Sequence, residues 1–253
     1  GNLVLDNYSF EYSTLNKANE VEVKKNQNFD LYGVTEGTGQ FSDLPGVQEE
    51  IESLSTAKLG EKLRNKSIYL DKNFTKDSLV ESFKTNNDYI HIATHFNVSG
   101  NTDELTQLLL GNKDIINLKE LRSLLPTFNN QLIVLSACES ANTQDFDNDN
   151  IYDGLAGVFQ EKGANNVLAT LWEISDEATS TFMLIFYSLL SSNDISPSTA
   201  LAFTQRIFKD ASFKNIPSNL YLTKSLKSKI SLNSLKNFSH PYFWSGFIIY
   251  TSQ

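Results

Sequence analysis

The chain contains one cysteine, Cys138, and three histidines, His91, His95 and His240. A thiol becomes an effective nucleophile when a nearby imidazole takes its proton or lowers its pKa. A lone cysteine is otherwise more often a small buried hydrophobic residue, so its position along the chain must decide between the two interpretations. With a single cysteine, the chain can form neither an intramolecular disulfide nor a thiolate metal cluster.

Two apolar segments place Cys138 and one histidine at equivalent positions. Residues 132–136 predict a core strand that leads directly into Ala137 and Cys138, and residues 89–94 predict a buried strand that ends at His95. In a parallel α/β sheet, functional groups collect at the carboxyl ends of the strands. If these two strands are neighbours, the imidazole and the thiol face each other across one crevice. The turn after Cys138 would then offer backbone N–H groups to an oxyanion.

The other two histidines have simpler interpretations. His91 shares the parity of His95 but lies in the middle of its strand, which predicts a buried and hydrogen-bonded core residue. His240 precedes Pro241 in an aromatic segment and is expected to pack near the C-terminal strand. His95 stands where the strand meets a loop and is expected to be exposed there, so it is the favoured base.

Predicted strands alternate with predicted helices along the chain. The strands are continuous apolar runs, which is typical of a mostly parallel sheet covered by helices on both faces. We therefore predict a three-layer α/β/α sandwich in one domain. The expected strands are 29–34, 67–70, 89–94, 108–110, 132–136, 166–172 and 247–250, and the expected helices are 43–54, 76–85, 117–125, 153–162, 178–190 and 196–209. Residues 1–28 suggest a strand with a helix or loop, and residues 212–237 a surface excursion.

Three of these helices begin with capping signals. Asp43 is a cap candidate just before Pro45 in the first helix. Asn117 with Glu120 has the spacing of a capping box, and Ser196 precedes Pro197 at the start of the 196–209 helix.

The composition is that of an ordinary globular protein, with 253 residues, 40% hydrophobic and 20% charged. A net charge of −9 argues against nucleic acid and anionic membranes as main partners. No apolar run approaches the roughly 18 residues of a membrane span. The first residues lack the features of a signal peptide. Gly1 in place of an initiator Met suggests a piece of a longer protein.

An acidic segment, residues 145–153, follows Cys138 and has alternating carboxylates like the start of a calcium loop. Asn150 stands where a calcium loop has Gly, and Ala156 where it has Glu. A solvated loop is therefore the favoured interpretation. Calcium binding and an acidic rim that attracts basic substrates remain as alternatives.

Several blocks of this sequence resemble CHAT domains, the caspase-like peptidases of bacteria that are often fused to TPR repeats. The resemblance covers roughly residues 29–253, and its specificity comes from the order of the blocks, because each one alone is weak. The blocks are Leu44-Pro45-Gly46 with Glu49-Glu50, the 89–95 segment ending Ala-Thr-His, the 134–140 segment centred on Ser-Ala-Cys, Gly154-Leu155-Ala156 with Gly163-Ala164, the 171–179 segment beginning Leu-Trp-Glu, and the 240–247 segment beginning His-Pro-Tyr-Phe-Trp.

The resemblance implies a caspase-like fold and a cysteine endopeptidase that needs no cofactor and no metal. Cys138 would be the nucleophile and His95 its base, with backbone amides of Phe96 and Cys138 as the oxyanion site. The family commonly has Gly where this chain has Phe96, which raises the question of how the 95–97 loop accommodates the larger side chain. The expected partners are a protein or peptide substrate and an upstream TPR or other regulatory domain or activator, in the cytoplasm.

The resemblance extends to separase, whose similar block carries an acidic group that receives a basic substrate residue. Asp176 would then line a pocket for Arg or Lys before the scissile bond, with Glu173 as a weaker candidate. Asp176 also stands where a helix begins, so a role as N-cap is equally supported.

Two other functions are compatible with the sequence. An amidotransferase-type glutaminase also places a cysteine after a strand, but its base follows the cysteine, which would nominate His240. The chain could also be a silent caspase-like module used for protein binding, although both His95 and Cys138 are present.

Overall fold

The computed structural model describes most of the chain. The described residues are 12–14, 28–39, 41–57, 59, 63, 65–85, 87–98, 106–136, 149–172, 174–192, 194–214, 222 and 230–252.

A seven-stranded sheet forms the centre of the fold, with the strand order β1-β10-β9-β8-β4-β2-β3. The five strands from β9 to β3 run parallel, β10 is antiparallel to β9, and β1 pairs parallel with β10. Their bounds are β1 Tyr12–Thr14, β2 Asn28–Gly33, β3 Asn65–Leu70, β4 Tyr89–Ala93, β8 Leu132–Leu135, β9 Asn166–Thr170 and β10 Phe247–Ser252. The predicted mostly parallel sheet is confirmed.

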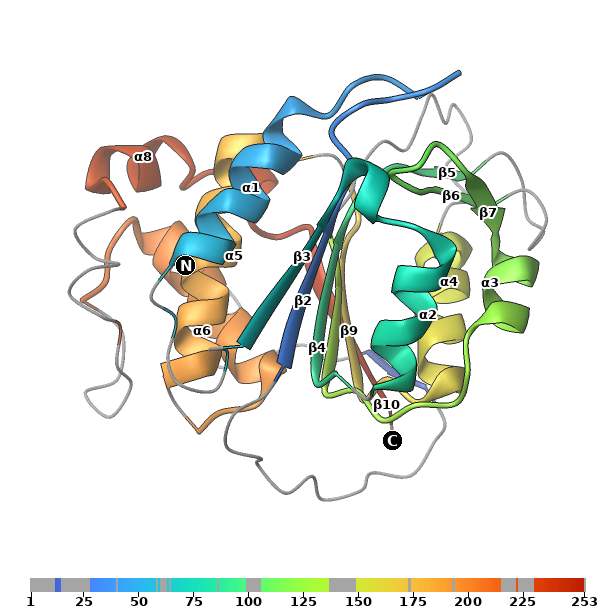
Figure 1. Ribbon diagram of the computed structural model, residues 1–253. Helices are drawn as coiled ribbons and strands as arrows, with labels where there is room; N and C mark the ends of the chain where they lie inside the picture. Colours follow the sequence, from blue (N-terminus) through green and yellow to red (C-terminus); the bar gives the residue numbers. More distant parts are fainter. Residues whose placement is uncertain are drawn as a thin grey trace.

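Helices cover both faces of this sheet, as Figure 1 shows, so the predicted three-layer sandwich is also confirmed. One layer contains α1 Pro45–Thr56, α5 Asp176–Ser192, α6 Pro197–Asp210 and α8 Leu232–Asn237. The opposite layer contains α2 Lys76–Lys84, α3 Leu118–Leu124 and α4 Asp149–Lys162. Each layer buries a separate hydrophobic cluster against the sheet, because successive side chains of a strand point to opposite faces.

A second, three-stranded sheet lies beyond the carboxyl end of β4. Its order is β5-β6-β7, all antiparallel, with bounds β5 Phe96–Val98, β6 Thr106–Leu109 and β7 Ile115–Asn117. Only β6 was predicted from the sequence. The chain passes from β4 into β5 through Thr94, whose hydroxyl donates to the Leu109 carbonyl at 2.7 Å. This bond ties the small sheet to the end of the central strand.

The capping predictions have mixed outcomes. Asn117 and Glu120 form the predicted capping box, and the Ser196 hydroxyl accepts from the Thr199 N–H. The prediction for Asp43 is wrong, because the N-cap of α1 is Leu44 and no side chain caps it. The Asp43 carboxylate instead accepts from the Gly37 N–H at 2.9 Å, which stabilises the loop before the helix.

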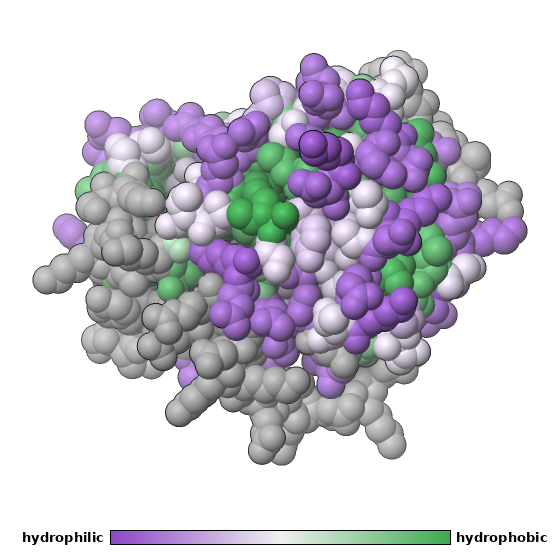
Figure 2. All heavy atoms as spheres, viewed as in Figure 1, coloured by the Kyte–Doolittle hydropathy of each residue, from purple (hydrophilic) through white to green (hydrophobic). Residues whose placement is uncertain are grey.

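The prediction that residues 212–237 form only a surface excursion is wrong for part of that segment. Leu222, Ile230 and Leu235 are buried in the hydrophobic cluster of the α1, α5 and α6 layer, and α8 packs against α6. The abundance of Lys, Ser and Asn concealed these few anchoring side chains. On the face seen in Figure 2 the surface is mainly hydrophilic, with hydrophobic surface confined to small areas.

Candidate active site

His95 lies just beyond the carboxyl end of β4, as predicted, but it is only 1% exposed, so the expectation of an exposed imidazole is wrong. Its Nε2 is 2.7 Å from the Ser42 carbonyl oxygen, and its ring lies 5.2 Å from the ring of Phe41. A carbonyl oxygen can only accept, so Nε2 carries a proton and, in the neutral imidazole, Nδ1 carries the lone pair. The loop before α1 therefore fixes both the orientation and the tautomer of His95. Sequence reasoning missed Ser42, because a backbone carbonyl leaves no signature in the residue type.

The strands that lead to His95 and to Cys138 are neighbours. β4 and β8 pair in parallel, with Ile92 opposite Leu135, and the Ser136 N–H donates to the Ile92 carbonyl at 2.9 Å. The two strands are therefore neighbours, as the predicted site requires, and the structure shows this pairing as far as Ser136. Cys138 itself lies outside the described residues, as do its turn and residues 145–148 of the acidic segment.

Phe96 was expected to stand in a loop, but it begins strand β5. Its side chain is 8% exposed and belongs to the hydrophobic cluster of the α2, α3 and α4 layer. Phe96 pairs with Leu108, and the flanking bond runs from the Leu109 N–H to the His95 carbonyl. Phe96 and Leu108 are therefore a non-hydrogen-bonded pair, in which the Phe96 N–H points away from β6. The bulky side chain is accommodated in the core, and the amide faces the outer side of an edge strand.

Asp176 is the first residue of α5 and is exposed. Thr179 N–H bonds to the Ser175 carbonyl, so the expectation that Asp176 is the N-cap is wrong by one position. Its carboxylate lies directly over Gly46, where an added Cβ would overlap the Asp176 side chain. Gly46 belongs to the first turn of α1, which has no acidic residue of its own. The Asp176 charge therefore stands at the positive end of a second helix.

The segment from Ser42 to Gly46 connects two of the candidate site residues, His95 and Asp176. Ser42 contacts His95 at one end of this segment, and Gly46 contacts Asp176 at the other. His95 and Asp176 thus border the same short stretch of chain. Glu173, the weaker pocket candidate, lies outside the described residues.

His91 is a fully buried, hydrogen-bonded core residue, as predicted. Its Nδ1 lies 3.2 Å from the Tyr187 hydroxyl and its Nε2 lies 3.3 Å from Glu50 Oε1. The same Glu50 oxygen accepts from the Ser136 hydroxyl at 2.7 Å. Sequence reasoning missed this cluster, although a signal was present. Glu50 lies on the apolar stripe of α1 between Val47, Ile51 and Leu54, where a carboxylate needs buried partners.

His240 is exposed, so the expectation that it packs near the C-terminal strand is wrong. Its Nδ1 accepts from the Tyr242 N–H at 3.3 Å and caps the short 3-10 turn Pro241–Phe243. A groove of about 350 Å³ lies between α1, α5 and α8, with Glu49 and Glu177 among its lining residues. Neither His95 nor Asp176 lines this groove.

Among the described residues, no group of three or more His, Cys, Asp or Glu side chains could hold a metal ion. Within the same part of the chain, every helix is too short or too polar to cross a membrane.

Comparison with known proteins identifies the family. The family model described as CHAT domain matches residues 9–252. A search of curated proteins found no match. Thirty chains of solved structures match, among them the crystal structure of Chaetomium thermophilum Raptor, with 14% sequence identity and a TM-score of 0.36. That match covers 84% of this chain and 26% of the Raptor chain, so this chain spans about a quarter of that protein. Because the family model covers nearly the whole length and the fold is the expected α/β sandwich, the chain belongs to the CHAT domain family, which is related to the caspase-like peptidases.

Proposed function

We propose that this chain is a cysteine endopeptidase that uses Cys138 as nucleophile and His95 as base. The observation that carries the proposal is the parallel pairing of β4 and β8, extended by the bond from the Ser136 N–H to the Ile92 carbonyl. Two neighbouring parallel strands end at the same edge of the sheet. His95 and Cys138 each follow one of them within three residues. Membership of the CHAT family supports the same assignment.

The hydrogen bond of His95 to Ser42 suggests how the proton moves. Nε2 donates to the Ser42 carbonyl, so the lone pair on Nδ1 is the one that takes the Cys138 proton. The thiolate then attacks the scissile carbonyl carbon, and the tetrahedral adduct collapses to a thioester as His95 returns the proton to the leaving amine. Water, deprotonated by the same imidazole, hydrolyses the thioester. The Ser42 carbonyl stabilises the imidazolium that forms in each step.

We propose that the backbone N–H groups of Phe96 and Cys138 bind the oxyanion. The outward direction of the Phe96 amide supports this role, because a donor on the outer side of β5 is not used by β6. The Phe96 side chain is buried in the core, so the amide and not the ring is the group that this residue would offer to a substrate.

We propose further that Asp176, with Glu173, selects Arg or Lys before the scissile bond. Support comes from the exposure of Asp176 and from the short segment, Ser42 to Gly46, that it shares with His95. A carboxylate fixed beside a backbone is well suited to bidentate binding of a guanidinium group.

The wider setting is proposed from the family resemblance alone. We propose that the chain is a single domain that acts on a protein or peptide in the cytoplasm of a bacterium. An upstream TPR domain, another regulatory domain or a ligand would activate it. The net charge of −9 is compatible with a basic substrate segment.

Substitution of the two dyad residues tests the proposal. We expect Cys138→Ala to abolish cleavage of a peptide library and His95→Ala to slow it by at least about a hundredfold, as loss of a general base does. His240→Ala is the matched control, because His240 is exposed and caps a turn. Activity that survives His95→Ala but not His240→Ala would reverse the assignment and favour a glutaminase-like base.

The specificity proposal has its own test. We expect the library to be cut after Arg or Lys, and Asp176→Asn to reduce the kcat/KM for these substrates by about tenfold or more, because the charge-assisted hydrogen bonds are lost. Ser175→Ala, at the neighbouring exposed position, should leave the preference unchanged. A different preference in the unsubstituted protein would remove Asp176 from the pocket and leave the dyad untouched.

A further inference from the structure

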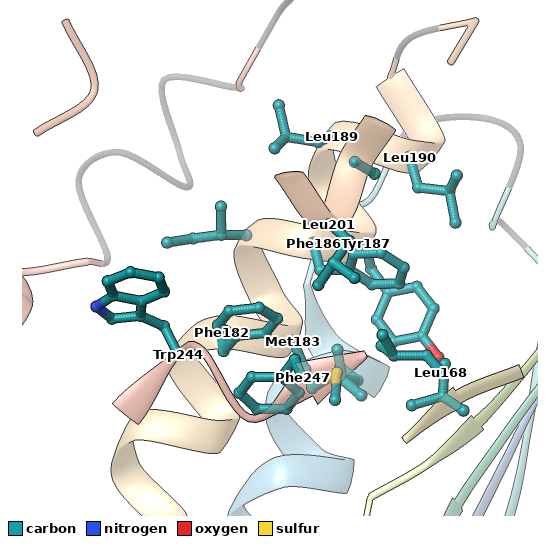
Figure 3. Packing of buried hydrophobic residues seen from close by; sticks show 14 of the residues in the cluster. Leu168, Phe182, Met183, Phe186, Tyr187, Leu189, Leu190, Leu201, Trp244 and Phe247 are labelled. Atoms are coloured by element: carbon teal, nitrogen blue, oxygen red, sulfur yellow. The ribbon is translucent and has the colours of Figure 1, made fainter. Parts of the chain in front are cut away.

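Four buried polar residues form a cluster on the α1 and α5 side of the sheet, which we call the Glu50 cluster. Its members are Glu50, His91, Ser136 and Tyr187, and they are 5%, 0%, 5% and 0% exposed, respectively. They come from α1, β4, the end of β8 and α5. Figure 3 shows Tyr187 reaching from α5 toward the sheet. A buried carboxylate costs several kcal/mol unless donors satisfy it, so this cluster requires an explanation.

With His91 neutral, the protons of the cluster have one consistent arrangement. Burial raises the pKa of Tyr187 well above its usual value, with the Glu50 charge adding to the shift, so the hydroxyl keeps its proton. If His91 donated from Nδ1 to this hydroxyl, its Nε2 lone pair would face the Glu50 oxygen and be repelled. Tyr187 therefore donates to Nδ1, and the imidazole proton is on Nε2, which lies 3.3 Å from Glu50. The Ser136 hydroxyl donates to the same oxygen.

Ser136 is held from two sides. Its N–H donates to the Ile92 carbonyl of β4 at 2.9 Å, and its hydroxyl donates to Glu50 at 2.7 Å. The backbone bond fixes the end of β8 against the strand that leads to His95. The side-chain bond fixes it against α1, and Cys138 follows only two residues later.

Helix α1, which carries the acceptor Glu50, also influences the orientation of His95. The loop before α1 supplies the Ser42 carbonyl that orients the imidazole, and Glu50 lies within the same helix. A displacement of α1 would therefore change both the orientation of His95 and the position of the end of β8. α1 packs against α5, which carries Tyr187.

From this arrangement we infer that Ser136 and Glu50 are positioning residues, which set the place of the Cys138 thiol relative to His95. This inference rests on the proposed dyad. His91 lies against Glu50, and Tyr187 in turn fixes the orientation of the His91 ring. None of the four would touch the substrate. The alternative is that the cluster only stabilises the fold.

The reactivity of the single thiol tests the inference without a known substrate. We would measure the rate constant for alkylation of Cys138 by iodoacetamide against pH in the whole chain, together with urea unfolding of each variant. An ordinary thiol has a pKa near 8.5 and is only a few per cent thiolate at pH 7. We expect Ser136→Ala to slow alkylation at pH 7 by roughly tenfold and to move the profile toward that of an ordinary thiol. Ser136→Thr, which keeps the hydroxyl, should restore it.

The matched control is Ser82→Ala. Ser82 is also buried and its hydroxyl also donates to a buried carboxylate, that of Asp30, but it belongs to α2. We expect Ser82→Ala to lower stability and to leave the alkylation profile unchanged. If Ser136→Ala keeps the unsubstituted profile, or if both serine variants change it in proportion to their loss of stability, the inference is overturned. If His95→Ala itself leaves the profile unchanged, the proposed dyad fails instead, so the two failures are distinguishable.

Discussion

Two buried carboxylates, Asp30 and Glu50, lie on opposite faces of the central sheet and use nearly the same types of partner. Asp30 is 1% exposed and accepts from the Ser82 hydroxyl and the Asn87 side-chain amide. Tyr32 completes this Asp30 cluster, with its hydroxyl beside Ser82 Oγ and donating to the Ser78 carbonyl at 2.7 Å. Each cluster thus contains a carboxylate, a serine and a tyrosine. The Glu50 cluster has an imidazole where the Asp30 cluster has an amide.

The two clusters differ in what they hold together. The Asp30 cluster joins β2 to the last turns of α2 and to Asn87, two residues before β4, near the amino ends of the strands. The Glu50 cluster joins α1 and α5 to the carboxyl end of β8, where the chain approaches Cys138. In a parallel sheet only the carboxyl ends carry functional loops. Similar chemistry is therefore expected to stabilise the fold at one end and also to position the site at the other.

We expect removal of Asp30 to lower the stability of the fold strongly and to leave the candidate site unchanged. Asp30→Ala leaves two buried donors, on Ser82 and Asn87, without their acceptor, so we expect the free energy of unfolding to fall by about 3 kcal/mol. Asp30→Asn keeps one acceptor oxygen and should cost less. Urea unfolding measures both variants. Alkylation of Cys138 in the folded protein should proceed at the unsubstituted rate, and a slower rate would mean that the amino end also acts on the site, which would end the distinction between the clusters.

Interactions within a few residues were predictable from the sequence, whereas most contacts of the candidate site were not. The capping box of Asn117 and Glu120 depends on a local pattern, and the core strands depend on apolar runs, so both were predicted correctly. The bond between Ser42 and His95 joins residues 53 positions apart, and that between Glu50 and Ser136 spans 86 positions. No local pattern specifies such pairs.

Even a local preference can be overridden. Asp43 stands where a cap is expected, but its carboxylate accepts from the Gly37 N–H and so stabilises the loop that carries Phe41 and Ser42. Glu50 shows the converse, because its position in an apolar stripe indicated a buried polar cluster without revealing its partners. The sequence could therefore indicate where unusual chemistry lies, but the identity of the partners required the fold.

The two buried tyrosines, one in each cluster, should cause a smaller effect, which is a loss of stability at high pH. Burial is the main cause that raises the pKa of Tyr32 and of Tyr187 in the folded chain, whereas both titrate near pH 10 when unfolded. Above about pH 10 the unfolded chain loses protons that the folded chain keeps, so the unfolded state is favoured and stability falls as pH rises. Each tyrosine should contribute about 1 kcal/mol to the loss between pH 10 and pH 11.

Tyr32→Phe and Tyr187→Phe should therefore each reduce that loss by about 1 kcal/mol relative to the unsubstituted protein. The double variant should reduce it by the sum, since the two residues lie on opposite faces of the sheet. Urea unfolding at pH 7, 10 and 11 provides the measurement, with the pH 7 values separating the loss of the hydroxyl bonds from the pH effect. A Tyr187→Phe protein with the unsubstituted pH dependence would show that Tyr187 titrates in the folded chain as it does in the unfolded chain, which would contradict the raised pKa.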